Sequence, residues 1–382
     1  MKYMKYIALV SLFFLSACQQ EVKIFGKENF PKQLSEWGVV LVDGQSLILN
    51  KGVVAYDLNT PLFTDYAHKL RTIWVPRDKI GQYTQASDIE LPIGSIVTKT
   101  FFYPRRGKQL LLSSDESDYF MGNGLDLSQV RLIETRVMVH LEAGWEALPY
   151  VWDDAQNEAT LAIAGDALSL SLTSENSTHD FQYIVPDYNQ CQGCHIENLN
   201  TKEMGLIGVK ARHLDKAYTH LHKTSDQLGN FVDQKILQKK PEQFSRNANW
   251  KQVSSDSKSK SKSKSKSKSK SKTHIARSYL DINCGHCHNP NGAADTSGMF
   301  LNIGETEGLQ LGVCKPPVAA GQGTGGRPVG ILPGNSEASI LTFRMQSVDV
   351  AAMMPELGRS LVHVEGVQAV SDWIDAMEGN CT

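Results

Sequence analysis

The chain contains the stretch Asn283-Cys284-Gly285-His286-Cys287-His288, and a second stretch of the same kind, Cys191-Gln192-Gly193-Cys194-His195, lies upstream. In a Cys-x-x-Cys-His motif the two thiols stand three positions apart, so each can form a thioether with a vinyl group of one haem. The histidine that follows is then held under the iron as its proximal ligand. The spacing predicts two covalent c-type haems attached at Cys191, Cys194, Cys284 and Cys287, with His195 and His288 as proximal iron ligands.

Two other uses of paired cysteines compete with haem attachment. Structural zinc sites also use Cys-x-x-Cys pairs, but such pairs normally lie about 15 to 20 residues apart. Here 89 residues separate Cys194 from Cys284, and each pair carries an adjacent histidine. A thioredoxin-like dithiol is the second alternative, but neither motif follows a strand in a recognisable βαβ unit. Haem attachment therefore remains the leading interpretation.

The N-terminus has the layout of an export signal. Lys2 and Lys5 form a positive region, and the apolar run from Tyr6 to Leu15 is too short to span a bilayer. Residues 15–18 read Leu-Ser-Ala-Cys, which resembles the bacterial lipobox and predicts Cys18 as the lipidated first residue of the mature protein. An ordinary secretory signal with an incidental cysteine is the alternative. Gln19 resembles the sorting signal for the outer membrane, so we expect a lipoprotein on its periplasmic face, or in the periplasm.

Two of the seven cysteines remain after the lipid acceptor and the four motif cysteines are assigned. These are Cys314 and Cys381. In an oxidising compartment two leftover cysteines pair more often than they stay free, so we predict a Cys314–Cys381 disulfide. Two buried, unpaired thiols are the alternative.

The charge is unevenly distributed. The chain has 39 basic and 41 acidic residues, but ten of the basic residues and one acidic residue lie in the leader and in residues 254–272. The rest of the chain therefore carries a net charge of about −11, and nucleic-acid binding is not indicated.

The patterning predicts a multidomain α+β protein, with a β-rich sandwich or barrel-like domain followed by mainly α, cytochrome c-like haem domains. Residues 133–141 alternate, with Ile133, Thr135 and Val137 on one face and Glu134 and Arg136 on the other, as in a half-buried strand. The expected units are a signal peptide (1–17), the β-rich domain (18–185), a first haem-binding segment (186–250), a Ser-Lys linker (251–273) and a cytochrome c domain (274–382).

Helical patterns are expected after the β-rich domain. We predict a long helix from Ala211 to about Leu237 in the first haem-binding segment. Residues 254–272 are dominated by a Ser-Lys alternation without apolar residues, so we expect an extended, disordered spacer; an electrostatic handle for an anionic partner is the alternative. In the last unit we predict a helix that runs into Cys284, a short helix through Met345 and an amphipathic helix from Gly366 to Met377.

The second haem needs a further axial ligand if its iron is to carry electrons without binding substrates. A thioether sulfur from methionine raises the potential relative to a second histidine. Met354 lies 66 residues after His288 and precedes a proline that would stiffen its loop. We predict Met354 as this ligand, with Met353 and Met345 as alternatives that would otherwise fill core space.

No comparable Met-Pro follows the first motif, and Met204 is too close to His195 to reach around a porphyrin. The sixth ligand of the first haem therefore stays open. The candidates are His213, His220 and His222, each of which is individually more typical of a surface histidine. His140 and His179 in the β-rich domain are further candidates. His286 lies between the two cysteines of the second motif, and we interpret it as having no role in binding the haem. We interpret His363 in the same way.

These residues together resemble a family of exported di-haem c-type cytochromes whose physiological role is unassigned. The C-terminal stretches that carry the resemblance are Ala276-Arg277-Ser278-Tyr279-Leu280, Asn283 to Pro290, Pro333-Gly334, Ser339-Ile340-Leu341, Arg344-Met345, Met353 to Gly358 and Trp373-Ile374. The earlier stretches are Pro61-Leu62-Phe63-Thr64-Asp65-Tyr66, Glu134-Thr135-Arg136, Tyr150-Val151-Trp152 and Ile207 to Arg212. The resemblance covers nearly all of the mature chain except the Ser-Lys run. It implies haem attachment at both motifs and no particular substrate.

Three functions follow as hypotheses. The first is a membrane-anchored electron carrier with redox protein partners, in which the tether between the haem units would allow electron transfer on transient docking. The second is a peroxidase-like or oxidase-like di-haem enzyme with an open first haem. The third is a partner-binding lipoprotein whose haems sense redox state. No Ser-His-Asp, Walker-type or paired-carboxylate pattern indicates a separate catalytic site, so an electron-transfer protein is favoured over a catalyst with its own substrate.

Overall fold

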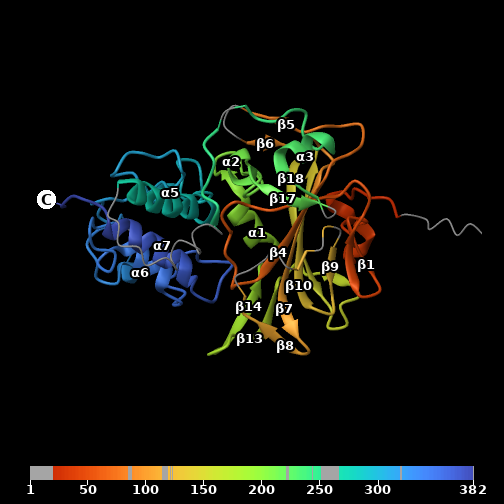
Figure 1. The fold of residues 1–382 in the computed structure, drawn as a ribbon, viewed down its shortest axis with the longest axis horizontal. Helices are drawn as coiled ribbons and strands as arrows, with labels where there is room; N and C mark the ends of the chain where they lie inside the picture. Colours follow the sequence, from red (N-terminus) through yellow and green to blue (C-terminus); the bar gives the residue numbers. More distant parts are fainter. Residues whose placement is uncertain are drawn as a thin grey trace, which may run out of the picture.

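The computed structural model describes residues 20–84, 88–113, 119–120, 122, 124–220, 223–242, 244–250, 266–318 and 321–381. Cys18, His222 and residues 251–265 of the Ser-Lys segment lie outside these ranges. Within them, one large β-sheet forms the centre of the N-terminal part, and a lobe with helices α5, α6 and α7 lies beside it (Figure 1).

The large sheet has nine strands among the described residues. They are β3 (Val54–Tyr56), β4 (His68–Trp74), β7 (Ile96–Arg106), β8 (Gln109–Leu111), β10 (Val130–Leu141), β11 (Gly144–Trp152), β12 (Ala159–Leu161), β13 (Asp166–Thr173) and β14 (Thr178–Val185). Strand β7 is central, because β4 pairs with one of its edges and β10 with the other, both antiparallel. The far end of β7 continues through β8 to the β13–β14 hairpin.

Smaller sheets surround the large one. They are the three-stranded sheet of β1 (Val40–Asp43), β2 (Ser46–Leu49) and β9 (Gly124–Asp126), and the pairs β5 (Gln82–Tyr83) with β6 (Ile89–Glu90), β15 (Ile196–Asn198) with β16 (Glu203–Met204), and β17 (Ala217–His220) with β18 (Lys223–Asp226). A turn at Gly44 joins β1 to β2, where the glycine takes a φ of 58°.

The described α-helices are α1 (Tyr188–His195), α2 (Ala211–Leu214), α3 (Gln227–Asp233), α5 (Lys266–Asn283), α6 (Ile340–Gln346) and α7 (Val364–Asp375). Short 3₁₀ turns are η1 (Lys27–Asn29), η2 (Leu34–Trp37), η3 (Asp295–Ser297) and η4 (Gly321–Thr324). No described helix is both long enough and apolar enough to cross a bilayer.

The expectation of mainly α haem domains is wrong, because the described structure is β-rich and has only six α-helices. The helix predicted over residues 211–237 is replaced by α2, the β17–β18 hairpin and α3. Asp226 explains part of this outcome: its side chain accepts a 2.8 Å hydrogen bond from the backbone N–H of Gly229 and so starts a new helix inside the predicted one. The three helices expected in the last unit are present, but loops and 3₁₀ turns connect them.

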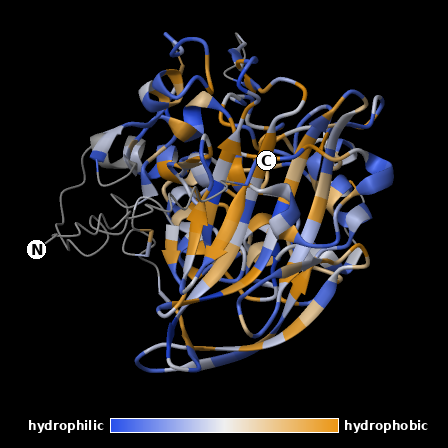
Figure 2. Cartoon of the chain, turned by 90° about the vertical axis from the view of Figure 1, so that its right-hand side faces the viewer, coloured by the Kyte–Doolittle hydropathy of each residue, from blue (hydrophilic) through white to orange (hydrophobic). Residues whose placement is uncertain are grey.

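Strand β10 differs from the half-buried strand that its alternation predicted. Val137 and Val139 pack in one hydrophobic cluster with Leu148 and Tyr150. Met138, on the opposite face, packs in a second cluster with Cys191, and Glu134 on that face is fully buried. Figure 2 shows hydrophobic residues running along the strands of the sheet. The polar face of β10 therefore points toward the first Cys-x-x-Cys-His motif and not toward solvent.

Helix α5 begins at Lys266, inside the range for which a disordered spacer was expected. Its C-terminal half is apolar on one side, where Ala276, Tyr279 and Leu280 pack against α7 residues Val370 and Trp373. This packing stabilises the C-terminal half of α5. The end of the Ser-Lys run can then extend this helix toward the N-terminus, because helix propagation adds one backbone hydrogen bond per residue once a turn has formed.

Candidate functional site

The first motif lies on α1, which starts at a reciprocal cap. Asp187 accepts a hydrogen bond from the backbone of Gln190 at 2.8 Å, and the Gln190 side chain accepts one from the backbone of Asp187 at 3.0 Å. The cap sets the helix register, and Cys191 and Cys194, three residues apart, then share a face. Cys191 is buried and Cys194 is half-buried. The two thiols are thus presented side by side next to the sheet.

The second motif continues α5 by one turn. The backbone N–H groups of Cys284 and His288 donate to the carbonyl oxygens of Leu280 (2.9 Å) and Cys284 (2.8 Å). Asn283 fixes this turn to the N-terminal part, because its side chain donates to the carbonyl oxygen of Pro61 at 3.0 Å and accepts from the N–H of Phe63 at 2.9 Å. The residue before the motif therefore joins it to the loop that precedes β4.

The two motif histidines are held in the same way. Nδ1 of His195 lies 2.8 Å from the carbonyl oxygen of Gly205, and Nδ1 of His288 lies 3.2 Å from that of Met299. Burial lowers the pKa of both rings, that of His195 to about 3, so both are neutral. A neutral ring whose Nδ1–H donates to a carbonyl keeps an unshared electron pair on Nε2, which is how histidine binds a metal. Both rings are therefore suited to bind an iron through Nε2.

The four motif cysteines are free in the structure. Burial raises the pKa of their thiols, to about 11 for Cys191 and about 12 for Cys284 and Cys287. A reactive redox dithiol requires a depressed thiol pKa, so the thioredoxin-like alternative is disfavoured. The described residues contain no cluster of three or more His, Cys, Asp or Glu side chains arranged for a metal ion, so the zinc alternative gains no support.

The two motifs lie next to each other. The loops that follow them are joined by a 3.0 Å hydrogen bond from the N–H of Leu199 to the carbonyl oxygen of Asn291. A cavity of about 370 Å³ has lining residues from both motifs, among them Cys194, His195, Gly285 and His286. Its volume is within the range of small-molecule sites. The expectation that the tether would bring the two units together only transiently is therefore not supported.

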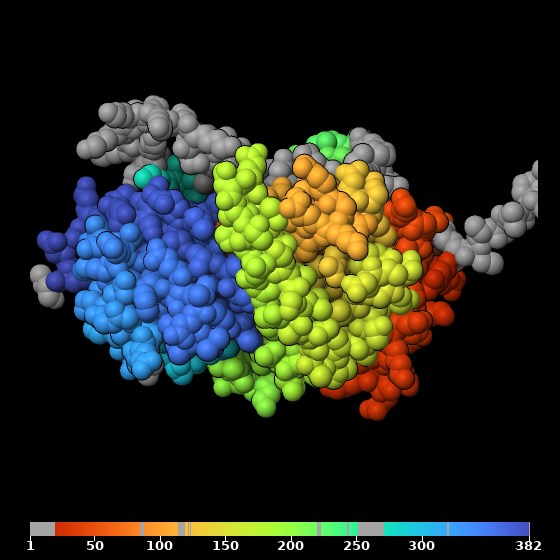
Figure 3. Space-filling model, turned by 90° about the horizontal axis from the view of Figure 1, so that it is seen from below, coloured from red at the N-terminus to blue at the C-terminus, as the bar shows by residue number. Residues whose placement is uncertain are grey.

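Several contacts fix the C-terminal lobe to the N-terminal part. Asp65 accepts hydrogen bonds from the backbone N–H groups of Ser360 (2.7 Å) and Leu361 (2.6 Å), and the Ser360 hydroxyl donates to the carbonyl oxygen of Gln182 at 2.5 Å. Tyr66 donates to Glu365 at 2.9 Å. Figure 3 shows the surface of the lobe directly against the strands around residue 180. The two parts therefore share an interface besides the one at the motifs.

The loop of the predicted methionine ligand lies beside the second motif. The N–H of Met354 donates to the carbonyl oxygen of Arg344 at 2.9 Å. Burial is the main cause of the raised pKa of Cys287 and the lowered pKa of His288, and the charge of Glu356, two residues after Met354, also acts on both groups, so this loop is close to the motif. Met345 and Met353 are buried, and Met345 packs in the hydrophobic cluster of the lobe. Met354 is only half-buried, and iron ligation by it stays a prediction.

The histidines considered for the first haem have other partners in the structure. His213 is buried, its Nδ1 is 3.1 Å from the amide nitrogen of Asn247, and its Nε2 is 3.4 Å from Asp281. His140 contacts the carbonyl oxygen of Leu91 at 2.8 Å and stacks on Trp145. His179 is exposed and bonds to Ser177. The side chain of His220 and all of His222 lie outside the described residues. Met204 pairs with Ile196 directly after the motif.

Two histidines that looked unremarkable in the sequence have specific environments. His286 lines the cavity between the motifs, and its Nδ1 is buried without a hydrogen-bond partner among the described residues. His363 stacks on Phe63, with ring centroids 4.3 Å apart, and its Nδ1 is 3.0 Å from the hydroxyl of Tyr279. Both environments depend on contacts between distant segments, which the local sequence does not encode.

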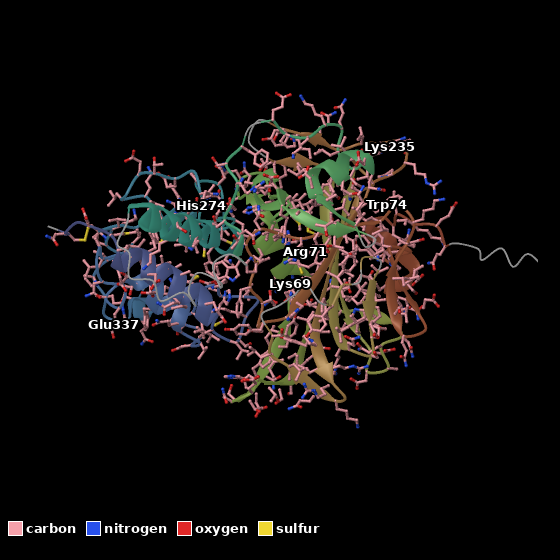
Figure 4. The ribbon with its side chains drawn as sticks, in the orientation of Figure 1. Lys69, Arg71, Trp74, Lys235, His274 and Glu337 are labelled. Atoms are coloured by element: carbon pink, nitrogen blue, oxygen red, sulfur yellow. A yellow bond between two sulfur atoms is a disulfide. The ribbon has the colours of Figure 1, made fainter. Side chains whose placement is uncertain are left out.

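A set of cations on the large sheet was missed by sequence reasoning. Lys69, Lys99 and Arg136 all approach the ring of Phe101, with their charged atoms 5.7, 5.6 and 4.5 Å from its centroid. Figure 4 shows Lys69 and Arg71 on β4 in the middle of the molecule. The signal was present as charged residues on three strands, but sequence reasoning considered the polar face of residues 133–141 alone, as one side of a half-buried strand.

Cys314 and Cys381 form a disulfide with an S–S distance of 2.01 Å, which is the pairing predicted from the sequence. It ties the chain end to the loop ahead of α6. Comparison of the chain with protein-family models, with curated proteins and with solved structures gave no match.

Proposed function

We propose that this chain is an exported di-haem c-type cytochrome that transfers electrons within the cell envelope. The observation that carries the proposal is the repeated geometry of the two motifs. In each, two cysteines share a helical turn and the following histidine donates Nδ1–H to a backbone carbonyl oxygen 10 or 11 residues further along the chain. The repetition matches what a proximal haem ligand requires, because the backbone contact fixes both the tautomer and the ring orientation.

Each residue has a separate role in the proposal. Cys191 and Cys194 hold one haem by thioether bonds, Cys284 and Cys287 hold the other, and His195 and His288 bind the two irons through Nε2. A haem iron supplies reversible one-electron chemistry when bound. Met354 completes the ligand set of the second site, where Arg359 holds its backbone. The chain itself supplies orientation, burial and the surrounding charge.

The adjacency of the motifs supports electron transfer within one molecule. Asn283 and the Leu199–Asn291 hydrogen bond hold the two attachment sites in one body. Electrons would enter and leave through redox protein partners, and the acidic remainder of the chain would favour partners with basic docking surfaces. Lipidation at Cys18 would place the protein at the periplasmic face of the outer membrane.

The test is the haem content of protein purified from its native envelope. We expect a mass two haems above that of the polypeptide and a red colour that survives denaturation. A Cys284→Ser/Cys287→Ser variant should retain one haem, and a Cys191→Ser/Cys194→Ser variant should retain the other. A Cys314→Ser/Cys381→Ser variant is the matched control and should retain both. Wild-type protein without covalent haem would overturn the proposal.

One observation favours the enzyme alternative for the first haem. Among the candidate ligands whose side chains the structure describes, His213 is the most deeply buried, yet Asn247 and Asp281 hold both of its ring nitrogens. The first iron would then have an open position that could bind a small oxidant. Absorption spectra with added cyanide or CO distinguish the two functions: binding at the first haem favours the enzyme, and no binding at either haem favours the carrier.

A further inference from the structure

A row of three cations crosses the centre of the large sheet. In the strand register Arg71 of β4 lies opposite Lys99 of β7, and Lys99 lies opposite Arg136 of β10. The next row on the same face holds Lys69, Phe101 and Glu134 in the same strand order. Like charges directly opposite one another in a sheet are destabilising. This arrangement therefore needs anions to compensate it.

Two of the three cations have a carboxylate partner. Arg136 binds Glu134 with two hydrogen bonds of 2.8 and 2.6 Å, and Arg71 binds Asp57 at 3.0 Å. Asp57 is shared with Lys216. Lys99 has neither a hydrogen bond nor an ion pair within the described part of the chain, and its ammonium group lies 5.6 Å from the centroid of the Phe101 ring. The row thus has one cation without a carboxylate in direct contact.

The position of Lys99 costs free energy in the protein without an added anion. Burial, together with the charges of Arg136, Arg71 and Lys69, holds the pKa of Lys99 well below its usual value of 10.5. Its side chain is half-buried, so water solvates the ammonium group only in part. An anion beside this group would therefore be stabilising.

The cation row faces the first motif. Met138, two residues from Arg136 on the same face of β10, packs in one hydrophobic cluster with Cys191. Lys99 lies opposite Arg136 in the strand register. The cation therefore faces the space in which a group attached to Cys191 and Cys194 would lie. A haem brings two propionate carboxylates into such a space.

We propose that Lys99, with Arg136 beside it, binds the propionate carboxylates of the haem attached at Cys191 and Cys194. This inference rests on the proposed function and identifies the part of the sheet that receives the haem. A lysine ammonium paired with a propionate also favours the reduced iron, because positive charge nearby opposes the additional positive charge of the oxidised state. The sheet would thereby raise the potential of the first haem.

The experiment compares Lys99→Gln with Lys108→Gln. Lys108 is exposed in the turn between β7 and β8. Its substitution therefore makes the same change of charge next to the same strand, β7, but away from the motifs. In redox titrations of the di-haem protein we expect Lys99→Gln to lower the equilibrium constant for reduction of one haem by about tenfold. Lys108→Gln should leave both potentials unchanged, and Lys99→Arg should retain the wild-type potential. Redox-difference infrared spectra should show shifted carboxylate bands in Lys99→Gln only.

The free energy of unfolding of the polypeptide without haem distinguishes propionate binding by Lys99 from a merely structural role of this residue. There Lys99→Gln removes a charge that repels its neighbours, so we expect the free energy of unfolding to rise or stay the same. Potentials and carboxylate bands equal to those of Lys108→Gln would overturn the inference. So would an equal fall of potential in Lys99→Arg, because that variant keeps the charge. Absence of covalent haem in the wild type would instead overturn the proposed function itself.

Discussion

Nη2 of Arg359 lies 2.9 Å from the carbonyl oxygen of Met354. The same guanidinium group also donates to the carbonyl oxygens of Arg344, Ser347 and Leu361 at 2.8 to 3.2 Å. Arg359 is buried, so these carbonyl groups replace the water that the guanidinium would otherwise bind. One side chain thus fixes both ends of the loop that carries the predicted iron ligand.

Replacing Arg359 by lysine should loosen the Met354 loop. A lysine keeps the positive charge, but its single ammonium cannot reach the four carbonyl groups that the planar guanidinium reaches. We expect the free energy of unfolding to fall by about 2–3 kcal/mol, and the second haem to bind CO and to have a lower potential. Arg246→Lys, at an exposed ion pair with Asp215, is the control. A variant that is destabilised but keeps the wild-type potential would argue against Met354 as the ligand.

Asp65 should make the docking of the lobe depend on pH. Burial raises its pKa to about 6, although the N–H groups of Leu361 and Ser360 act in the opposite direction. The folded protein therefore binds this proton more tightly than the unfolded chain, so the stability contribution of Asp65 is full below about pH 4 and is lost as the pH rises through 6. Asp65→Asn removes this titration and keeps an oxygen that can accept both hydrogen bonds.

Urea unfolding of wild type and Asp65→Asn measures the effect. Between pH 4 and pH 7 the difference in free energy of unfolding should change by up to about 3 kcal/mol in favour of the asparagine variant. Asp78→Asn, at an exposed position, should show no such change. A difference that is constant over this range would show that Asp65 has an ordinary pKa.

Much of the candidate site could be predicted from local sequence. The spacing of Cys284, Cys287 and His288 requires only one helical turn, and the stripe of Val367, Val370 and Trp373 specifies a terminal helix by its periodicity alone. The Cys314–Cys381 pairing followed from the number of cysteines left over. Each of these inferences depends on neighbours within one segment or on a count.

The features of the fold and of the candidate site that were not predicted depend on which distant segment packs over each surface. The alternation in β10 correctly predicted a strand, but the burial of Glu134 depends on Tyr183, whose hydroxyl donates to it at 2.6 Å from β14. Lys99 likewise looks like an ordinary strand lysine in the sequence. Its environment is set by Arg71 and Arg136, which β4 and β10 place on either side of it. The mainly α interpretation of the haem-binding parts failed in part because the single helix predicted over residues 211–237 did not take account of Asp226, which caps a new helix inside that range.

Asp281 should be the most sensitive position at the interface of the two parts. It lies on α5 and receives hydrogen bonds from Arg212 (2.8 Å), Asn247 (3.0 Å) and the backbone N–H of Ile303 (3.0 Å). Burial opposes its ionisation, but His213 and Arg212 hold the pKa of Asp281 below its usual value. Asp281→Ala would remove the buried carboxylate that accepts from Arg212, Asn247 and Ile303, at a cost of about 3–5 kcal/mol.

Thermal and denaturant unfolding of Asp281→Ala test this expectation. Asp372→Ala, which removes an exposed ion pair with Lys272 on the same lobe, should cost less than about 1 kcal/mol. If the two variants are equally stable, the Arg212–Asp281 pair contributes nothing beyond a surface ion pair.

The disulfide should stabilise the lobe through the unfolded state. Cys314 and Cys381 are 67 residues apart, so the crosslink closes a long loop that includes α6, the Met354 loop and α7. Chain-entropy arguments give about 4 kcal/mol for a loop of this length. With the haem irons kept in one oxidation state throughout, we expect Cys314→Ser/Cys381→Ser, and wild type treated with a thiol reductant, to lose a similar free energy of unfolding, whereas the reductant should have no effect on the double variant. Because the motif cysteines lie outside the closed loop, haem content should be unchanged. A reductant effect on the double variant would instead indicate that a motif cysteine pair is oxidised, and haem could not then occupy that pair.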